Sequence, residues 1–179
     1  NLAFQPIVSL NSGKIHHFEV LARFGKDCEK SPFELITFAE DTGLVSNFDL
    51  AMCRKALNWV ARMNKQGKKY VIAVNLSGQS VGNTAFLSAL HDLLNQYAAL
   101  RPQIMFEITE SARIQDLELA NNFTQGLHNE GHKVCLDDFG AGSAALRYLH
   151  SLVVDLVKID GQYVKSAMNK GRYKSFLRS

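Results

Sequence analysis

The sequence predicts an α/β fold, a (β/α)8 barrel of TIM type, of which residues 1–179 supply about six of the eight strand-helix units. Apolar runs of strand length alternate with stripes of helical period, a pattern typical of a parallel sheet. Polar residues end successive runs, namely Glu19, Asn75, Glu107, Asp137 with Asp138, and Lys158. These positions lie 56, 32, 30 and 21 residues apart. One barrel unit takes roughly 30 residues, so the first interval holds a long connection or one intervening element.

The first two elements form a predicted β-hairpin. Residues 3–10 and 16–24 have strand patterns, and residues 11–13 between them form a turn sequence. Glu19 lies in the second strand among apolar neighbours, where a carboxylate needs a partner. Arg23 follows on the same strand face, so a structural ion pair is one interpretation and a metal ligand is the other.

Two helices follow the hairpin. Ser31 before Pro32 is a helix-start signature, and this helix is expected to stop near Gly43. The second helix is predicted by apolar residues at spacings of three and four, and it closes at Gly67. The stripe consists of Phe48, Met52, Ala56, Val60 and Met63.

Strands and helices then alternate along the chain. The β-branched run at 70–74 is typical of a strand that is covered on both faces. Further strands are expected at 104–108, 133–136 and 153–157, and helices at 87–97, 117–127 and 144–150. Because parallel strands end at one edge, their polar ends are expected to meet at a single rim.

The pair Asp137 and Asp138, which ends the strand at 133–136 and precedes a glycine-rich turn, is the central candidate site. Two unpaired carboxylates so close together repel each other, and a divalent cation relieves that repulsion. A surface turn is the alternative, since Asp and Gly are common turn residues. Glu107 and Glu110, near the end of the predicted strand at 104–108, are a second pair of carboxylates at a strand end. The alternative is that one of them faces solvent.

Two other polar ends also have two interpretations. Asn75 either caps a turn or offers its side-chain oxygen to a hard cation. Lys158 directly follows an apolar run. Carboxylates beside it would keep its ammonium charged and aimed, whereas an isolated surface lysine is the alternative.

Composition places the chain among ordinary soluble globular proteins, with 46% hydrophobic and 21% charged residues. The net charge of +3 is too small to favour a nucleic acid polymer as partner, and no run approaches the ~18 apolar residues of a membrane span. Cys28, Cys53 and Cys135 fit neither a disulfide framework nor a zinc site, so a reducing cytoplasm is expected. The chain begins within a predicted strand and without methionine, and we expect further sequence on both sides.

Short motifs follow one another in order along the whole chain. Glu19-Val-Leu-Ala-Arg23 is similar to the Glu-Ala-Leu-x-Arg signature of the EAL-domain phosphodiesterases, which hydrolyse cyclic di-GMP, with Val20 in place of Ala. Other blocks that resemble this family are Gln5-Pro-Ile-Val8, Ala39-Glu40, Val74-Asn75-Leu76-Ser77, Glu107-Ile-Thr-Glu110-Ser111, Asp137-Asp-Phe-Gly140 and Lys158-Ile-Asp160.

The resemblance implies a site with two Mg²⁺ or Mn²⁺ ions. A first ion would be bound by Glu19, Asn75, Glu107 and Asp137, and a second would be held with the help of Asp137 and Asp138. Two cations would neutralise the phosphodiester, lower the pKa of a bridging water and stabilise the leaving oxygen. The product would be the linear dinucleotide pGpG.

The resemblance also assigns the remaining roles. Lys158 would position or activate the attacking water, and Glu110 would brace the loop after Asp138. Gln5, Leu21 and Arg23 would meet the dinucleotide. A homodimer and an upstream sensory or GGDEF-type domain are the implied partners.

Two departures from the family pattern and three alternative functions remain. Residues 141–145 read Ala-Gly-Ser-Ala-Ala where the family has Thr-Gly-Tyr/Phe-Ser-Ser in a loop that contributes to dimer contacts, and the family's later glutamate and glutamine fall outside this sequence. The first alternative is a catalytically inactive EAL-like receptor for cyclic di-GMP, and the second is a protein-interaction module. A glycosidase using Glu107 and another carboxylate is the third.

Overall fold

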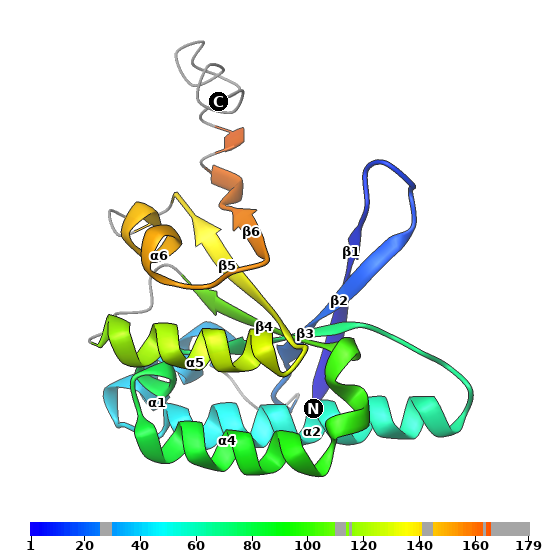
Figure 1. Ribbon diagram of the computed structural model, residues 1–179, viewed down its shortest axis with the longest axis horizontal. Coiled ribbons are helices and arrows are strands. Elements are labelled where there is room, and N and C mark those ends of the chain that lie inside the picture. The colour runs from blue at the N-terminus through cyan, green and yellow to red at the C-terminus, as the bar shows by residue number, and fades with distance from the viewer. Residues whose placement is uncertain (26–29, 110–113, 115, 141–144, 163, 166–179) are drawn as a thin grey trace.

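The computed structural model describes residues 1–25, 30–109, 114, 116–140, 145–162 and 164–165. Within them, six strands form one sheet in sequence order (Figure 1). The strands are β1 Leu2–Val8, β2 Ile15–Ala22, β3 Ile72–Leu76, β4 Ile104–Thr109, β5 Lys133–Phe139 and β6 Leu156–Ile159. β1 runs antiparallel to β2, and β2 to β6 are parallel. The predicted hairpin and parallel sheet are therefore confirmed.

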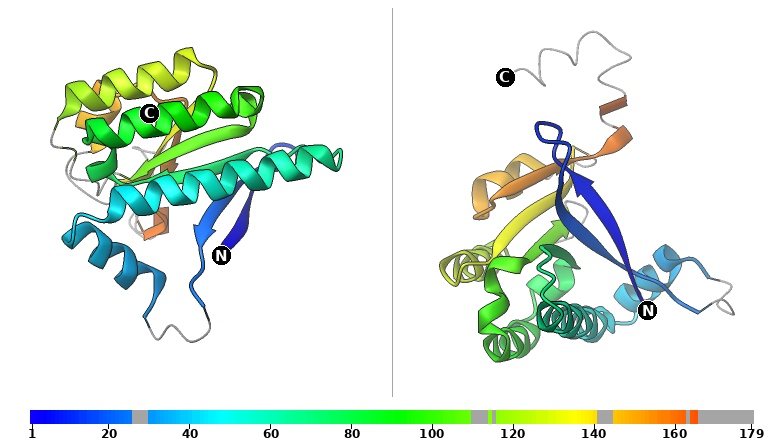
Figure 2. Two further views of the ribbon diagram at one scale, coloured as in Figure 1. Left: turned by 90° about the horizontal axis from the view of Figure 1, so that it is seen from below. Right: turned by 90° about the vertical axis from the view of Figure 1, so that its right-hand side faces the viewer.

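The helices connect the parallel strands, and they cover one face of the sheet. They are α1 Pro32–Asp41, α2 Val45–Lys65, α3 Gly78–Val81, α4 Thr84–Gln96, α5 Leu117–Asn129 and α6 Ala145–Ser151, with a 3-10 helix, η1, at Ala98–Gln103. α2, α4 and α5 lie side by side along this face (Figures 1 and 2), and α1 packs on α2. Between β2 and β3, which are neighbours in the sheet, the described residues of the 56-residue interval form α1 and α2 and no further strand.

Local sequence explains the helix ends that were predicted. The Ser31 side chain accepts a hydrogen bond from the Glu34 backbone, and the Glu34 side chain accepts one from the Ser31 backbone, which together form a capping box. Beyond α2, Gly67 has φ 74°, a conformation that glycine adopts without steric cost. The short α3 and η1 were not predicted, since each is only about one or two turns long.

The two faces of the sheet have different contents because strand residues alternate. The helix-covered face contributes Val20, Val74, Phe106 and Val134 to the main hydrophobic core. The opposite, inner face carries a small apolar cluster of Ala73, Met105, Cys135 and Leu156. Two residues further along the same strands come Asn75, Glu107, Asp137 and Lys158, so the polar layer lies directly above an apolar one.

Strand β5 continues past its predicted end. It runs to Phe139 rather than Leu136, and its pairing with β6 shifts register between these two residues. Asp138 lies in this irregular segment with φ 56°, and it is the described residue other than glycine with a positive φ. Asp and Asn tolerate this left-handed conformation better than most residues. The surface-turn interpretation is wrong for Asp137, which pairs with Thr109 inside the sheet.

Two further predictions concern cysteines and membrane spans. Cys53 and Cys135, the cysteines within the described part, are both free and buried. Among the described helices, none combines the length and the apolar character that a membrane span requires.

Candidate active site

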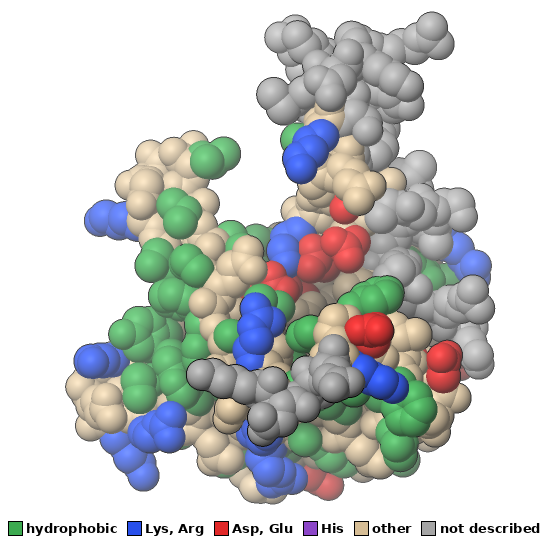
Figure 3. Space-filling view, turned by 180° about the vertical axis from the view of Figure 1, so that it is seen from behind, with side chains coloured by type: hydrophobic (Ala, Val, Ile, Leu, Met, Phe, Trp, Pro, Cys, Tyr) green, Lys and Arg blue, Asp and Glu red, His purple; other side chains and the backbone are tan. Residues whose placement is uncertain are grey.

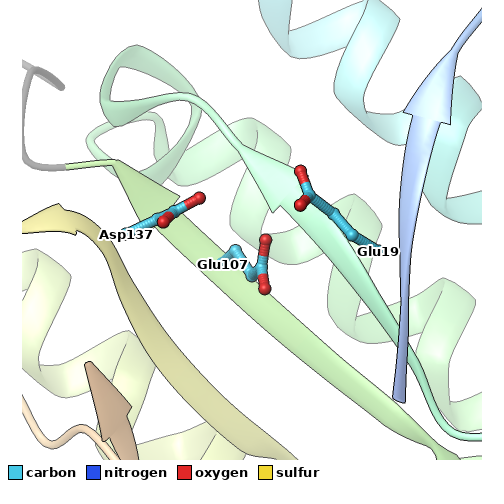
Figure 4. Close-up of side chains that lie close together, drawn as sticks. All are labelled: Glu19, Glu107 and Asp137. Atoms are coloured by element: carbon cyan, nitrogen blue, oxygen red, sulfur yellow. The ribbon is translucent and has the colours of Figure 1, made fainter. Parts of the chain in front are cut away.

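Three carboxylates and one ammonium meet on the inner face of the sheet. Lys158 Nζ lies 2.7 Å from Asp137 Oδ2, 3.0 Å from Glu107 Oε2 and 3.2 Å from Glu19 Oε2. The three carboxylates come from β5, β4 and β2 and point toward one common space (Figure 4). On the molecular surface, acidic side chains gather beside a basic one near the centre of the face in Figure 3. The predicted common rim therefore forms around these four side chains.

Electrostatics at this cluster favours the charged forms of Lys158 and Glu107. Burial alone would lower the pKa of Lys158, but hydrogen bonding to Asp137 and the charge of Glu107 raise it well above its usual range. Burial would likewise raise the pKa of Glu107, which is fully buried, yet contacts with His17 and Lys158 lower it. The lysine is thus held charged and aimed by carboxylates, as the sequence predicted, and is not an isolated surface residue.

A divalent cation fits this donor set. One ligand atom from each of Glu19, Glu107 and Asp137 lies within 4.8 Å of the other two. Three carboxylates share one ammonium here, so two negative charges remain unbalanced. Carboxylate oxygens are the ligands that Mg²⁺ and Mn²⁺ prefer. The chemistry of the site therefore matches the metal that the sequence motifs imply.

Glu19 has different partners from the one considered in the hairpin. Its Oε2 pairs with Lys158, and its Oε1 accepts a hydrogen bond of 3.1 Å from Asn75 Nδ2. The Arg23 guanidinium instead donates to the Ala22 carbonyl oxygen. The structural ion pair between Glu19 and Arg23 is therefore not formed, and Asn75 lies beside Glu19 at the cluster.

Asp138 lies near the cluster but outside its three-carboxylate group. The Asp138 backbone N–H donates to Asp137 Oδ1 at 2.8 Å. Burial raises the pKa of Asp138, and the negative charges of Asp137 and Asp160 raise it further. The irregular end of β5 thus places a second carboxylate within electrostatic reach of the first, as bulges next to active sites often do.

The predicted substrate-binding residues lie on or just after the hairpin. Gln5 is exposed and directly opposite Glu19 in the antiparallel pair, so both side chains are on the same face. Leu21 lines a pocket of about 190 Å³ that also includes Asn75, and Arg23 is exposed just past β2. The predicted catalytic residue Glu110 lies outside the described residues.

Asp49 is a buried carboxylate that the sequence reasoning missed. Its Oδ2 accepts hydrogen bonds from the Ser77 backbone N–H at 2.8 Å and from the Ser80 hydroxyl at 2.7 Å. It thereby anchors the turn that follows Asn75 on β3. The available signal was an acidic residue at helical spacing between Val45 and Cys53, where a core position is expected.

Replacing Asp49 with Asn is expected to change how stability depends on pH. Burial raises the pKa of Asp49, although hydrogen bonds from Ser77 and Ser80 oppose this. Because the folded pKa is above the ordinary 3.8, the proton favours folding at low pH, and this stabilisation is lost as pH rises through the folded pKa. The variant, whose amide oxygen still accepts both bonds, should gain stability relative to the wild type between about pH 3 and pH 7.

Chemical denaturation at several pH values checks this expectation. Asp92→Asn, on the exposed face of α4, serves as the control and should show no such trend. A constant difference between Asp49→Asn and wild type across this pH range would contradict the expectation.

His17 is the second residue that was missed. It is 2% exposed, and its Nε2 lies 3.7 Å from Glu107 Oε1. The signal for it was its position two residues before Glu19, since residues at that spacing share a strand face.

The fold and the cluster together define the class: a barrel-type α/β protein with a carboxylate-lysine site on the inner face of its sheet. The EAL domain family matches residues 1–179, and the chain belongs to that family.

Two curated relatives show what similar proteins are called. The chain is 34% identical over 176 residues to "Cyclic di-GMP phosphodiesterase PdeB" of Shewanella oneidensis, with 96% of the chain and 21% of the relative covered. It is 33% identical over 163 residues to "Probable cyclic di-GMP phosphodiesterase PdeB" of Escherichia coli, with 90% and 31% covered. The chain thus spans less than a third of the length of these relatives.

Solved structures agree with the fold. The EAL domain of FimX from Pseudomonas aeruginosa, bound to c-di-GMP, matches with a TM-score of 0.82 at 26% identity, covering 99% of this chain and 72% of that one. The complex of the PaMucR phosphodiesterase with c-di-GMP matches with a TM-score of 0.77 at 26% identity, covering 90% and 69%. Six strands of an EAL-type barrel are therefore confirmed, whereas two further units completing it stay a prediction.

Proposed function

We propose that this chain belongs to an enzyme that hydrolyses cyclic di-GMP to linear pGpG with the help of Mg²⁺ or Mn²⁺. The observation that carries the proposal is the convergence of Glu19, Glu107 and Asp137 on Lys158. Membership of the EAL family supports it, as do relatives that are named cyclic di-GMP phosphodiesterases. A receptor that only binds the dinucleotide has less need of three carboxylates placed close together, because their repulsion costs stability.

Each carboxylate has an assigned task in this proposal. A first divalent ion would be held by Glu19, Asn75, Glu107 and Asp137. A second would be held with the help of Asp137 and Asp138. When bound, such ions neutralise phosphate charge and lower the pKa of a coordinated water. The apolar layer beneath the cluster, which includes Met105 and Cys135, keeps water away from the lower side of the carboxylates.

Lys158 would serve the reacting centre as a fixed positive charge. Its ammonium carries three N–H donors, and carboxylates surround it at 2.7 to 3.2 Å. Because its pKa is raised, the group stays protonated at neutral pH and would act on an attacking water as a donor rather than by removing its proton. All three donors contact carboxylates here, so a donor would become free for the water once a bound ion takes over one of these carboxylates.

The dinucleotide would lie along the hairpin edge of the cluster. Gln5 shares the strand face of Glu19, and Leu21 lines the adjoining pocket. Arg23 would meet a phosphate, for which a guanidinium fork is well suited. Glu110 would brace the loop after Asp138.

We further propose that residues 1–179 form part of a single EAL domain in a homodimer, with a sensory or GGDEF-type domain upstream. The cytoplasm is the proposed location, since cyclic di-GMP is the proposed substrate and the two described cysteines are free.

The proposal is tested by following cyclic di-GMP turnover with the purified protein. With Mn²⁺ or Mg²⁺ present, pGpG is expected to appear on liquid chromatography. EDTA should abolish its formation, and fresh Mn²⁺ should restore it, because the three carboxylates are negative and cannot neutralise the phosphodiester without a cation.

Binding measured on the same sample separates hydrolysis from the alternative. Binding of cyclic di-GMP without any pGpG, at saturating Mn²⁺, would show a receptor instead of an enzyme. Absence of both binding and turnover would leave the protein-interaction module and the glycosidase as the remaining alternatives.

A further inference from the structure

A histidine lies against the buried carboxylate at the centre of the site. His17 and Glu107 are 2% and 0% exposed, and they come from β2 and β4. His17 Nε2 and Glu107 Oε1 are 3.7 Å apart. Within the described part of the chain, neither atom has a hydrogen-bond partner, so each polar atom has only the other facing it. Buried polar atoms without partners are costly, and this favours a mutual interaction.

The neighbouring histidine decides which nitrogen of His17 carries the hydrogen. His16 Nδ1 and His17 Nδ1 are 2.8 Å apart, so one of them donates and the other accepts. A neutral imidazole has a single N–H. If His17 Nδ1 accepts from His16, the hydrogen of His17 sits on Nε2 and points at Glu107 Oε1. If His17 instead carried its hydrogen on Nδ1, the lone pair of its Nε2 would face a lone pair of Glu107 Oε1. Burying two such acceptors against each other is unfavourable.

We propose that His17 is a positioning residue that orients Glu107 for cation binding, an inference that rests on the proposed function. Glu107 Oε1 faces His17, while Oε2 faces the space shared with Glu19 and Asp137. A separation of 3.7 Å exceeds the length of a good N–H···O bond. Among the residues that the structure describes, no other hydrogen-bond partner holds either atom, so a small rotation of the carboxylate would complete the bond.

This arrangement gives the two oxygens of Glu107 separate tasks. The oxygen next to His17 is fixed, so the carboxylate plane is set before a cation arrives, and the other oxygen is presented to it. Residues that hydrogen-bond to metal ligands typically affect metal affinity about 10- to 100-fold. His16, which is exposed, acts one step further out by fixing the tautomer of His17.

Mn²⁺ binding in the absence of substrate tests the inference. His17→Phe keeps a ring but removes the N–H, and the dissociation constant for Mn²⁺, measured by titration calorimetry, is expected to rise about 10- to 100-fold. His17→Gln retains an N–H donor and should recover most of the affinity. His132→Phe is the matched control, because His132 is also 2% exposed and contacts the Ile104 carbonyl instead of a carboxylate.

The outcomes separate the inference from the function on which it rests. Wild-type protein that binds Mn²⁺ and forms pGpG, together with a His17→Phe variant of unchanged Mn²⁺ affinity, would overturn the role of His17 alone. Wild-type protein that neither binds Mn²⁺ nor turns over substrate would overturn the proposed function.

If circular dichroism shows His17→Phe to be unfolded, His16→Ala replaces it. The His16→Ala variant should also bind Mn²⁺ more weakly than the wild type, and an unchanged affinity contradicts the inference.

Discussion

Glu107→Gln is expected to lower the rate of cyclic di-GMP hydrolysis by at least about 100-fold while the protein stays folded. Glutamine has the shape of glutamate, but it removes one of the three negative charges around Lys158. A bound cation contributes several kcal/mol of transition-state stabilisation, and each 1.36 kcal/mol is a factor of ten in rate. Steady-state production of pGpG at saturating Mn²⁺ measures the effect.

Glu130→Gln provides the matched control for this loss. Glu130 is a partly buried carboxylate with ion pairs to His91 and Arg101, but it follows α5 and lies outside the carboxylate cluster. Its variant should keep the wild-type rate. Comparable rates for Glu107→Gln and Glu130→Gln would mean that the cluster is not the reacting centre.

The parts of the fold that could be predicted from the sequence are those with strong local signals. The hairpin has a turn sequence between two strand patterns, α1 has its Ser31 cap, and α2 has a five-residue apolar stripe. The polar strand ends could be predicted to converge because parallel strands end at one edge. The structure brings Glu19, Glu107 and Asp137 together in that way.

What could not be predicted depends on contacts between distant segments. The irregular end of β5, with Asp138 at φ 56°, coincides with a register shift in the pairing with β6, which is distant in sequence. Asp49 reaches Ser77 across 28 residues, and Lys158 reaches Glu19 across 139 residues. Arg23 is close to Glu19 in sequence, but it lies beyond the end of β2 and donates to the Ala22 carbonyl oxygen, whereas Lys158 on β6 pairs with Glu19.

Lys158→Met is expected to lower the free energy of unfolding of the metal-free protein by about 3 kcal/mol. Methionine keeps an unbranched apolar side chain but removes the cation that the three carboxylates share. Breaking a buried ion pair costs about 3–5 kcal/mol, and the lower end applies because the lysine is 25% exposed. For a domain of this size, that loss corresponds to a decrease in Tm of roughly 6–12 °C.

Added Mn²⁺ is expected to raise the Tm of Lys158→Met more than that of the wild type. Without the ammonium, the repulsion among the three carboxylates is no longer compensated. A bound divalent ion therefore relieves more repulsion, and adds more stability, in the variant than in the wild type. Lys133→Met, at the exposed start of the neighbouring strand β5, should match the wild type with and without Mn²⁺. Thermal denaturation with EDTA and with Mn²⁺ measures both effects. If Mn²⁺ stabilised all three proteins equally, the ion would bind elsewhere than at the space now filled by the Lys158 ammonium.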